Sequence, residues 1–391
     1  VSIASRSGWT TWFILSTDMA ITNNAGKNMK KFTAGLIAVA LLAGANTVYS
    51  AELSAEDASE AAGNYMKYCA LCHGADRQGH VNDHAPSLRS ESLMKSGFPH
   101  HIYLTVSYGR LGTPMAGFID EVGGPMSRDE IIQMLYWIRQ ESGVTEQVDL
   151  YPDPVTGDIE LGASLYAREC AECHGKEGEG VTGTALGNPA MLSLTEDQFL
   201  RYAIENGRDG TPMKAFGEVL SGKEIDALTA FLRSRATGWA VEKPVYRAPP
   251  AVEDYVINPD ADAPQFDLKD GLYVMSADLY QALQDKRRMV LLDTRMMSYW
   301  QMVNIEGSVP MPYYYEFGEF EQLARDLPKD GTWIVTYCEC PRAAAESVNR
   351  KLSALGFENT AVLWEGIQGW VALGYPVARG ETTTVEVQAL P

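Results

Sequence analysis

Residues 69–73 have the sequence Cys-Ala-Leu-Cys-His, in which two thiols three positions apart are followed at once by an imidazole. This spacing attaches a haem, because each thiol can form a thioether with one haem vinyl group while the adjacent His meets the iron. A thioredoxin-like redox pair or half of a zinc site would also contain two cysteines at this spacing. A second copy, Cys-Ala-Glu-Cys-His at residues 170–174, favours haem attachment over both alternatives.

Each pentapeptide is followed by a second repeated motif. Residues 109–118 are Gly-Arg-Leu-Gly-Thr-Pro-Met-Ala-Gly-Phe, and residues 207–216 are Gly-Arg-Asp-Gly-Thr-Pro-Met-Lys-Ala-Phe, which aligns Met115 with Met213. A thioether on a proline-containing loop can supply the iron ligand opposite His and raise the reduction potential. We therefore expect two covalently bound haem c groups with these methionines as distal ligands, although a lone Met would be core filler by default. The attachment cysteines would be Cys69, Cys72, Cys170 and Cys173, and the proximal ligands His73 and His174.

Histidines other than the proximal ligands occur only in the first half of this repeat, and any of them is an alternative to Met115 as a ligand. They are His80, His84, His100 and His101. We expect them instead to be solvated loop and helix-start residues. The second half contains no His except His174, so Met213 has no rival imidazole there.

Helical patterns flank these motifs. After each Met loop, residues 127–138 and 221–232 begin with Ser and have Glu three positions on, which is a capping box, followed by apolar residues at helical spacing. Before each pentapeptide, Tyr65 and Tyr166 occupy equivalent positions. The sequence thus predicts a helix on each side of both haem motifs.

With these motifs the chain resembles class I cytochrome c domains, twice in tandem, over residues 54–142 and 157–237. The resemblance implies two all-α, single-haem domains in which the first helix packs across the last. It also implies that the carbonyl groups of Pro86 and Pro189 orient the proximal histidines through their second ring nitrogen. The matched Met loops argue against an open iron site, which a haem peroxidase or oxidase would need.

The chain has 391 residues, which is long enough for two to three domains. Its charge balance restricts the partners that it can bind. Its formal net charge is −19, so nucleic acid and anionic membrane surfaces should repel it. We expect periplasmic redox proteins that offer a basic docking patch as partners, and a small sulfur compound is a further candidate.

An export signal is predicted near the N-terminus. Residues 29–31 are Met-Lys-Lys, residues 32–45 are largely apolar, and small residues precede Ala51, so residues 29–50 are typical of a cleaved signal peptide. An uncleaved anchor is the alternative, and residues 1–28 are interpreted as an over-extended start. Periplasmic localisation agrees with the cysteine usage, because four of the six lie in the haem motifs and no disulfide framework remains.

The composition changes after the second repeat. Residues 238–266 contain five prolines and little periodicity, which predicts a semi-rigid linker. From residue 267 to 391, helix and strand patterns alternate. The clearest strands are the apolar runs at residues 289–292 and 333–337, and a helix is expected over about 342–355. This order predicts an α/β domain with a central, mostly parallel sheet.

Residues of this third region resemble a rhodanese-like domain over about 272–380. The motifs are Leu-Leu-Asp-Thr-Arg at 291–295, Ile-Glu-Gly-Ser-Val-Pro at 305–310, the strand that ends at Tyr337-Cys338, and residues 364–377. In that family a Cys after the central strand carries a persulfide, which loop amides and a helix N-terminus stabilise. The resemblance gives as candidate catalytic residues Cys338, Cys340, Arg342 and Asp293.

The loop that the resemblance implies for the persulfide, residues 338–343, departs from the family pattern. It has no Gly, its Arg comes one position early, and Glu339 beside the nucleophile would disfavour a thiolate. Strand alignment favours Cys338 as the nucleophile over Cys340, and we expect Arg342 to offset Glu339 while Pro341 stiffens the loop. The prediction is a dihaem cytochrome coupled to sulfane-sulfur or persulfide chemistry, with sulfurtransferase or persulfide-oxidising activity. The alternative is a pure electron carrier with a non-catalytic docking or sensing module.

Overall fold

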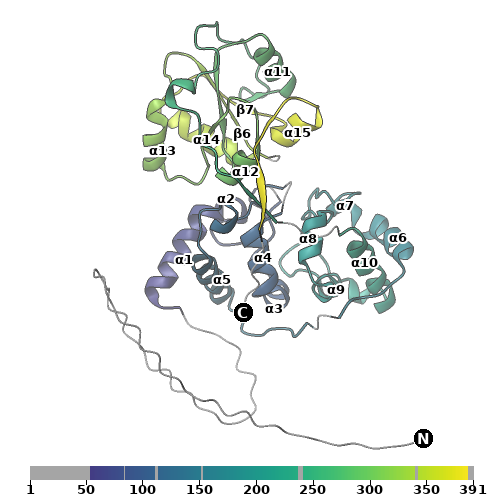
Figure 1. Ribbon diagram of the computed structural model, residues 1–391. Helices are drawn as coiled ribbons and strands as arrows, with labels where there is room; N and C mark the ends of the chain where they lie inside the picture. Colours follow the sequence, from purple (N-terminus) through teal and green to yellow (C-terminus); the bar gives the residue numbers. More distant parts are fainter. Residues whose placement is uncertain are drawn as a thin grey trace, which may run out of the picture. The chain divides into compact units, whose positions relative to one another are not determined.

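The computed structural model describes residues 53–82, 84–110, 113–150, 153–236, 241–339 and 342–385 (Figure 1). The predicted signal peptide and two residues of the sulfur loop, Cys340 and Pro341, lie outside these ranges. Among the helices described, none combines the length and the apolar character that crossing a membrane requires.

The first helical domain is built around two crossing helices. Its helices are α1 (Ala55–Tyr68), α2 (Ala70–His73), α3 (Glu91–Gly97), α4 (His100–Tyr108), η1 (Asp120–Val122) and α5 (Arg128–Ser142). Helix α5 begins with the predicted capping box of Ser127 and Glu130. Helix α1 packs against α5, where the rings of Tyr65 and Trp137 lie 5.3 Å apart between centroids. The predicted contact between the first and last helix is confirmed.

The second helical domain repeats this plan. Its helices are α6 (Ile159–Glu169), α7 (Ala171–His174), α8 (Pro189–Leu194), α9 (Asp197–Asn206), η2 (Phe216–Glu218) and α10 (Gly222–Ser234). Helix α6 crosses α10, and the rings of Tyr166 and Phe231 lie 5.4 Å apart between centroids. The crossing is so close that a Cβ at Gly162 would overlap the carbonyl oxygen of Ala227.

The third domain contains a parallel five-stranded sheet in the order β2-β7-β6-β3-β5. These strands are β2 (Tyr273–Val274), β3 (Met289–Asp293), β5 (Val309–Pro310), β6 (Trp333–Tyr337) and β7 (Thr360–Leu363). The helices are η3 (Val252–Asp254), α11 (Ser276–Gln284), α12 (Met297–Met302), α13 (Phe317–Leu323), η4 (Ala324–Asp326), α14 (Ala343–Ala354) and α15 (Gly366–Ala372). The predicted α/β architecture with a parallel sheet is therefore confirmed.

Helices cover both faces of this sheet, as Figure 1 shows for α11 and α15 on one side and α13 and α14 on the other. Strand β3 is buried along its whole length, and its residues alternate between two hydrophobic cores. Leu291 packs in the core that contains Trp370 of α15, and Leu292 packs in the core that contains Leu352 of α14. Burial on both faces explains why its sequence is continuously apolar.

Part of the segment predicted as a linker is a strand. Residues Val241–Pro244 form β1, which pairs antiparallel with β9 (Thr382–Val385). A second antiparallel pair is formed by β4 (Val303–Asn304) and β8 (Ala378–Arg379). Further along, Ile257 forms an isolated bridge with Met289 of the central sheet. The prolines of this stretch are compatible with the pairing, because Pro244 stands at the end of its strand.

Candidate functional site

The first haem motif forms a tight turn at the end of α1. The amide groups of Cys72 and His73 both donate to the carbonyl oxygen of Cys69, and the buried hydroxyl of Tyr65 donates to the carbonyl of Gly74 at 2.7 Å. His73 Nδ1 lies 2.8 Å from the carbonyl oxygen of Pro86, which can only accept, so Nδ1 carries the hydrogen. The predicted role of the Pro86 carbonyl is confirmed, and Nε2 is left with its lone pair.

The second motif repeats this turn with a different supporting carbonyl. Tyr166 donates to the carbonyl of Gly175 at 3.0 Å, and His174 Nδ1 lies 2.7 Å from the carbonyl oxygen of Thr184. The prediction that Pro189 plays this part is wrong, because Pro189 instead opens α8. The loop passes close to the His174 ring at Gly183, the residue before Thr184. A Cβ at Gly183 would lie 2.9 Å from His174 Cε1, so a residue without a side chain suits this approach.

Both imidazoles are in the state that binds iron. Burial lowers the pKa of His73, although the hydrogen bond to the Pro86 carbonyl acts in the opposite direction. Burial also lowers the pKa of His174. Neutral rings with a free Nε2 are suitable ligands, so the turn, the tautomer and the protonation state all fit a covalently held haem.

The two Met loops have matching hydrogen bonds. The amide of Arg110 donates to the carbonyl of Met115 at 2.7 Å, and that of Arg208 donates to the carbonyl of Met213 at 2.8 Å. In each loop the Thr hydroxyl donates to the Arg carbonyl, at 2.7 Å in the first copy and 2.6 Å in the second. Each Met is partly buried against the core of its own domain. Their ligation of iron stays a prediction.

The four other histidines differ in their surroundings. His80 and His84 are exposed loop residues with positive φ, and His100 begins α4, as expected. His101 departs from the expectation of a solvated residue. Its ring stacks on Phe199 of α9 in the second domain, with 3.9 Å between centroids and 25° between planes. This contact joins two regions far apart in the sequence, which is why the local pattern did not indicate it.

The sulfur loop begins directly after β6. Cys338 is 4% exposed, its thiol donates to the carbonyl of Glu339 at 3.0 Å, and its own carbonyl accepts from the amide of Ile367 at 2.9 Å. Asp293 is fully buried at the end of the neighbouring strand β3, where Arg295 holds its carboxylate with an Nη2–Oδ2 distance of 2.6 Å. The structure thus brings Cys338 and Asp293 to the same edge of the sheet.

The partner of Glu339 is Arg295, and the prediction that Arg342 offsets Glu339 is wrong. Arg295 Nη1 lies 2.9 Å from Glu339 Oε1, whereas Arg342 donates to the carbonyl of Trp364 and lies over its ring at 3.8 Å. Burial raises the pKa of Glu339, although the Arg295 charge lowers it. Two carboxylates thus share one buried guanidinium next to Cys338. The Asp-Thr-Arg end of β3 was the available signal for this pairing.

Two parts of the chain match known protein families. Residues 157–232 match the family model of cytochrome C oxidase, cbb3-type, subunit III, and residues 276–373 match that of the rhodanese-like domain. The chain carries a c-type cytochrome region and a rhodanese-like domain. Cytochrome domains of this kind imply covalently bound haem c.

The curated relatives match the cytochrome region. FixP, a subunit of cbb3-type cytochrome c oxidase from Azorhizobium caulinodans, is 29% identical over 176 residues, which are 44% of this chain and 57% of that protein. The CcoP subunit from an Azospirillum species is 25% identical over 190 residues, 44% of this chain and 60% of the relative. The chain thus spans less than two thirds of the length of these relatives.

Solved structures match the rhodanese-like domain. A rhodanese-related protein from Thermoplasma volcanium is 27% identical with a TM-score of 0.23, covering 27% of this chain and 97% of that one. A thiosulfate sulfurtransferase from Pseudomonas aeruginosa is 20% identical with a TM-score of 0.25, covering 30% of this chain and 22% of that one.

The rhodanese-like domain packs on the first cytochrome domain through the carboxyl edge of its sheet, the edge at which Cys338 lies. Met296, which follows β3, is 3% exposed and belongs to the core of the cytochrome domain. The Tyr313 hydroxyl, after β5, donates to the carbonyl of Tyr68 at 2.8 Å, one residue before Cys69. Helix α14, which follows the sulfur loop, contacts the haem-attachment turn α2.

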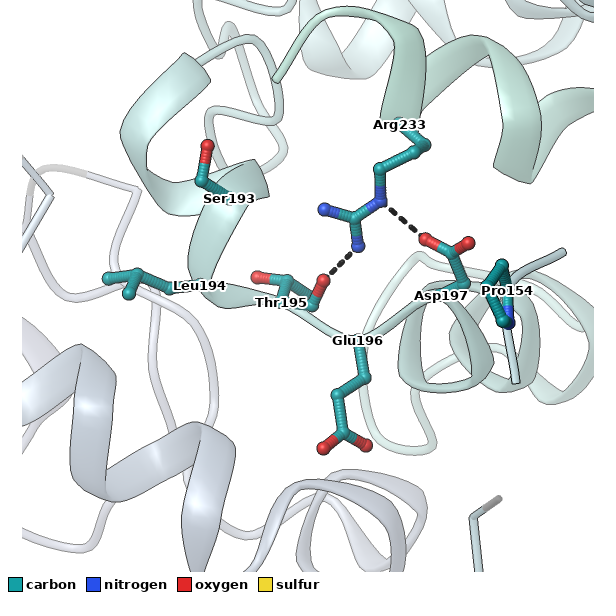
Figure 2. A pocket seen from close by; sticks show the side chains of 7 residues that line it. All are labelled: Pro154, Ser193, Leu194, Thr195, Glu196, Asp197 and Arg233. Atoms are coloured by element: carbon teal, nitrogen blue, oxygen red, sulfur yellow. Dashed lines mark hydrogen bonds and ion pairs between the residues drawn. The ribbon is translucent and has the colours of Figure 1, made fainter. Parts of the chain in front are cut away.

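A pocket of about 400 Å³ lies in the second cytochrome domain (Figure 2). The residues that line it include Arg233 of α10 and Asp197 of α9, which form an ion pair. Arg233 also donates a hydrogen bond to the carbonyl of Thr195, which lines the pocket as well. These bonds tie α10 to the start of α9. The lining contains none of the predicted haem or sulfur residues, so we interpret the pocket as structural.

Proposed function

We propose that the chain is an exported dihaem electron-transfer protein whose rhodanese-like domain oxidises persulfide or thiol sulfur and passes the electrons to its own haems. The observation that carries the proposal is the packing of the sheet edge that bears Cys338 against the first haem-attachment turn. A sulfur site and a haem site in contact within one chain need no diffusional encounter to exchange electrons.

Two matching sets of residues support one haem in each cytochrome domain. Thioethers would form at the two cysteines of each motif, and the side chains that hold the iron would be His73, Met115, His174 and Met213. When bound, each haem would take up or give up one electron, so the pair matches a two-electron sulfur oxidation. The supporting carbonyls of Pro86 and Thr184 keep the proximal rings in the required tautomer.

The sulfur chemistry would use Cys338 together with Cys340. Loss of two electrons from the two thiols joins them as a disulfide, releases two protons to water and sends one electron to each oxidised haem. A disulfide across one intervening residue is strained. If a small persulfide first transfers its outer sulfur to Cys338 and leaves as a thiol, the same oxidation closes a longer, three-sulfur bridge.

A second candidate function is supported by the surroundings of Cys338. The side chain is buried, its thiol is bonded to the Glu339 carbonyl, and the adjacent Asp293–Arg295–Glu339 cluster contains more carboxylates than cations. Such a loop suits a domain that binds a partner or senses sulfur without turnover. In this alternative the chain is purely an electron carrier.

The partners follow from the charge. The acidic chain would dock periplasmic redox proteins through basic patches on their surfaces, and electrostatic steering would make the association rate fall with added salt. Nucleic acid is not a partner in this proposal.

The proposal is tested by mixing the oxidised holoprotein with a small-molecule persulfide and following haem reduction in a stopped-flow instrument. Wild type should be reduced at least about tenfold faster than Cys338→Ser, while ascorbate, which needs no sulfur site, should reduce both proteins at the same rate. Equal rates with persulfide would favour the docking function, because small thiols can reduce exposed haem edges directly.

A further inference from the structure

A chain of hydrogen bonds begins at the peptide group that precedes the sulfur loop. The carbonyl of Tyr337, the residue before Cys338, accepts from the amide of Thr294 at 2.9 Å and from its hydroxyl at 3.0 Å. The carbonyl of Thr294 in turn accepts from the amide of Tyr313 at 3.1 Å. Peptide bonds and two successive hydrogen-bonded steps therefore connect Cys338 to Tyr313.

Tyr313 continues this connection into the first cytochrome domain. Its hydroxyl donates to the carbonyl of Tyr68 at 2.8 Å, a usual length for a well-formed O–H···O bond. The peptide bond of Tyr68 leads directly to Cys69, one of the two expected attachment points of the first haem. The connected groups thus reach from the sulfur loop to the haem turn with no step longer than a hydrogen bond.

A lysine of α14 holds the bridging segment in place. The Lys351 ammonium donates to the carbonyls of Tyr313 at 2.7 Å and Tyr315 at 2.6 Å. Between them, the ring of Tyr314 packs edge-on against that of Tyr68, with 5.4 Å between centroids. The helix that carries the lysine begins directly after the sulfur loop, so the loop and the bridging tyrosine are fixed relative to each other.

We infer that Tyr313 links the sulfur site to the first haem, so that electrons leaving the sulfur of Cys338 tunnel along these bonds to Cys69. Tunnelling decays less steeply along covalent and hydrogen bonds than across van der Waals gaps, so the side chain that bridges the domains controls the rate. Tyr313 is not oxidised itself and is a positioning residue. The two electrons of the sulfur oxidation pass one after the other, and the first haem hands one on to the second. The inference rests on the proposed function and names the haem that receives the electrons.

Pulse radiolysis of the oxidised holoprotein isolates this step from the sulfur chemistry before it. A carbon dioxide radical anion gives one electron to the Cys338–Cys340 disulfide and becomes carbon dioxide. The disulfide radical anion then returns to the disulfide as one ferric haem becomes ferrous. With the other four cysteines in thioethers, no second disulfide can form within the chain. Haem absorbance should show a reduction phase whose rate is independent of protein concentration, and Cys338→Ser should lack it.

The decisive variant is Tyr313→Phe, which keeps the ring and loses the bond to the Tyr68 carbonyl. It should slow the intramolecular phase at least about threefold, because a van der Waals gap replaces a hydrogen bond. The matched control is Tyr314→Phe, which removes a hydroxyl from the same contact but outside the path, and its rate should equal that of wild type. Both haem midpoint potentials should be the same in all three proteins, since a disturbed haem site would shift them.

Amide hydrogen exchange checks the path without any electron transfer. The amides of Thr294 and Tyr313 should exchange at least about tenfold more slowly than in the unfolded chain, and fast exchange at either one would contradict the path.

The remaining outcomes also decide the inference. A wild-type rate in Tyr313→Phe would overturn it and assign the transfer to the packing of α14 on α2. Equal slowing in Tyr314→Phe would overturn it as well, because packing and not the hydrogen bond would then set the rate. Absence of the intramolecular phase in wild type would show that these sulfurs do not reduce the haem. The proposed function has its own test in the reaction of Cys338→Ser with persulfide, so the link through Tyr313 can fail while that function stands.

Discussion

The two cytochrome domains share their attachment turns and Met loops but differ in the contacts that surround them. In both, a buried Tyr hydroxyl closes the haem turn, and the Thr of the Met loop bonds the Arg carbonyl. The carbonyl behind the proximal ring comes from Pro86 in one domain and from Thr184 in the other. The repeat thus predicts the residues of the motif itself. The carbonyl group that bonds the proximal His differs between the domains, because it depends on the path of the loop that follows each motif.

The largest effect should come from removing a distal ligand. Met213→Ala is expected to abolish about half of the Met-to-iron charge-transfer absorbance of the oxidised protein, because each domain would contribute one His/Met haem. Met115→Ala should remove the other half, and the double variant all of it. A wild-type spectrum typical only of bis-His haem would contradict the ligand assignment in both domains.

The helix crossing offers a second comparison, because Ala61 and Gly162 occupy equivalent positions. The first crossing accommodates the methyl group of Ala61, which is fully buried. Gly162→Ala should destabilise the second domain by about 1–3 kcal/mol, since its Cβ meets backbone that cannot move aside. Thermal unfolding followed by circular dichroism measures this. The control is Gly63→Ala in α1, which meets no atom and should stabilise by about 0.5–1 kcal/mol.

Repeated motifs and continuous apolar runs could be predicted from the sequence, whereas contacts that depend on the path of a loop could not. The parallel sheet was predictable because β3 is a continuous apolar run, and the Met loops were predictable because they repeat. The Thr184 carbonyl was not, since the carbonyl that meets a ring depends on the path of the intervening loop. The stacking of His101 on Phe199 joins residues distant in the chain, and local patterns carry no signal for such a contact.

The interface between the cytochrome domains can be weakened at Asp209, whose position is occupied by Leu111 in the first repeat. Burial acts to raise its pKa, but the hydrogen bonds from Ser92 and Glu91 hold the pKa of Asp209 below its ordinary value. The stabilisation is therefore present above the unfolded pKa and is lost as the pH falls through the lower folded value. Asp209→Asn should cost about 1 kcal/mol at pH 7 and reduce the loss of stability on acidification below about pH 4.

A urea titration at several pH values measures both quantities. Asp153→Asn, which alters an exposed carboxylate just before the second domain, is the control and should behave as wild type. If Asp209→Asn has the same stability as wild type at every pH, the hydrogen bonds to Asp209 contribute nothing to the interface.

The smallest effect is expected at the contact with the rhodanese-like domain. Lys67 and Glu319 lie 3.7 Å apart on the surface, and such a pair contributes less than about 1 kcal/mol. Lys67→Met should leave unfolding by urea nearly unchanged, whereas Tyr313→Phe should cost about 1 kcal/mol by removing the hydrogen bond to the Tyr68 carbonyl. A larger loss in Lys67→Met than in Tyr313→Phe would show that charge, and not the tyrosine contact, holds the domains together.

Whether each cytochrome domain holds its own haem is tested most directly by intact-mass spectrometry of the protein as isolated, combined with thiol alkylation. The expected mass is that of a chain beginning at Ala51 plus two haem groups, with Cys69, Cys72, Cys170 and Cys173 all protected from alkylation because their sulfurs are thioethers. A mass with a single haem, or alkylation of either pair of cysteines, would contradict a haem in each repeat.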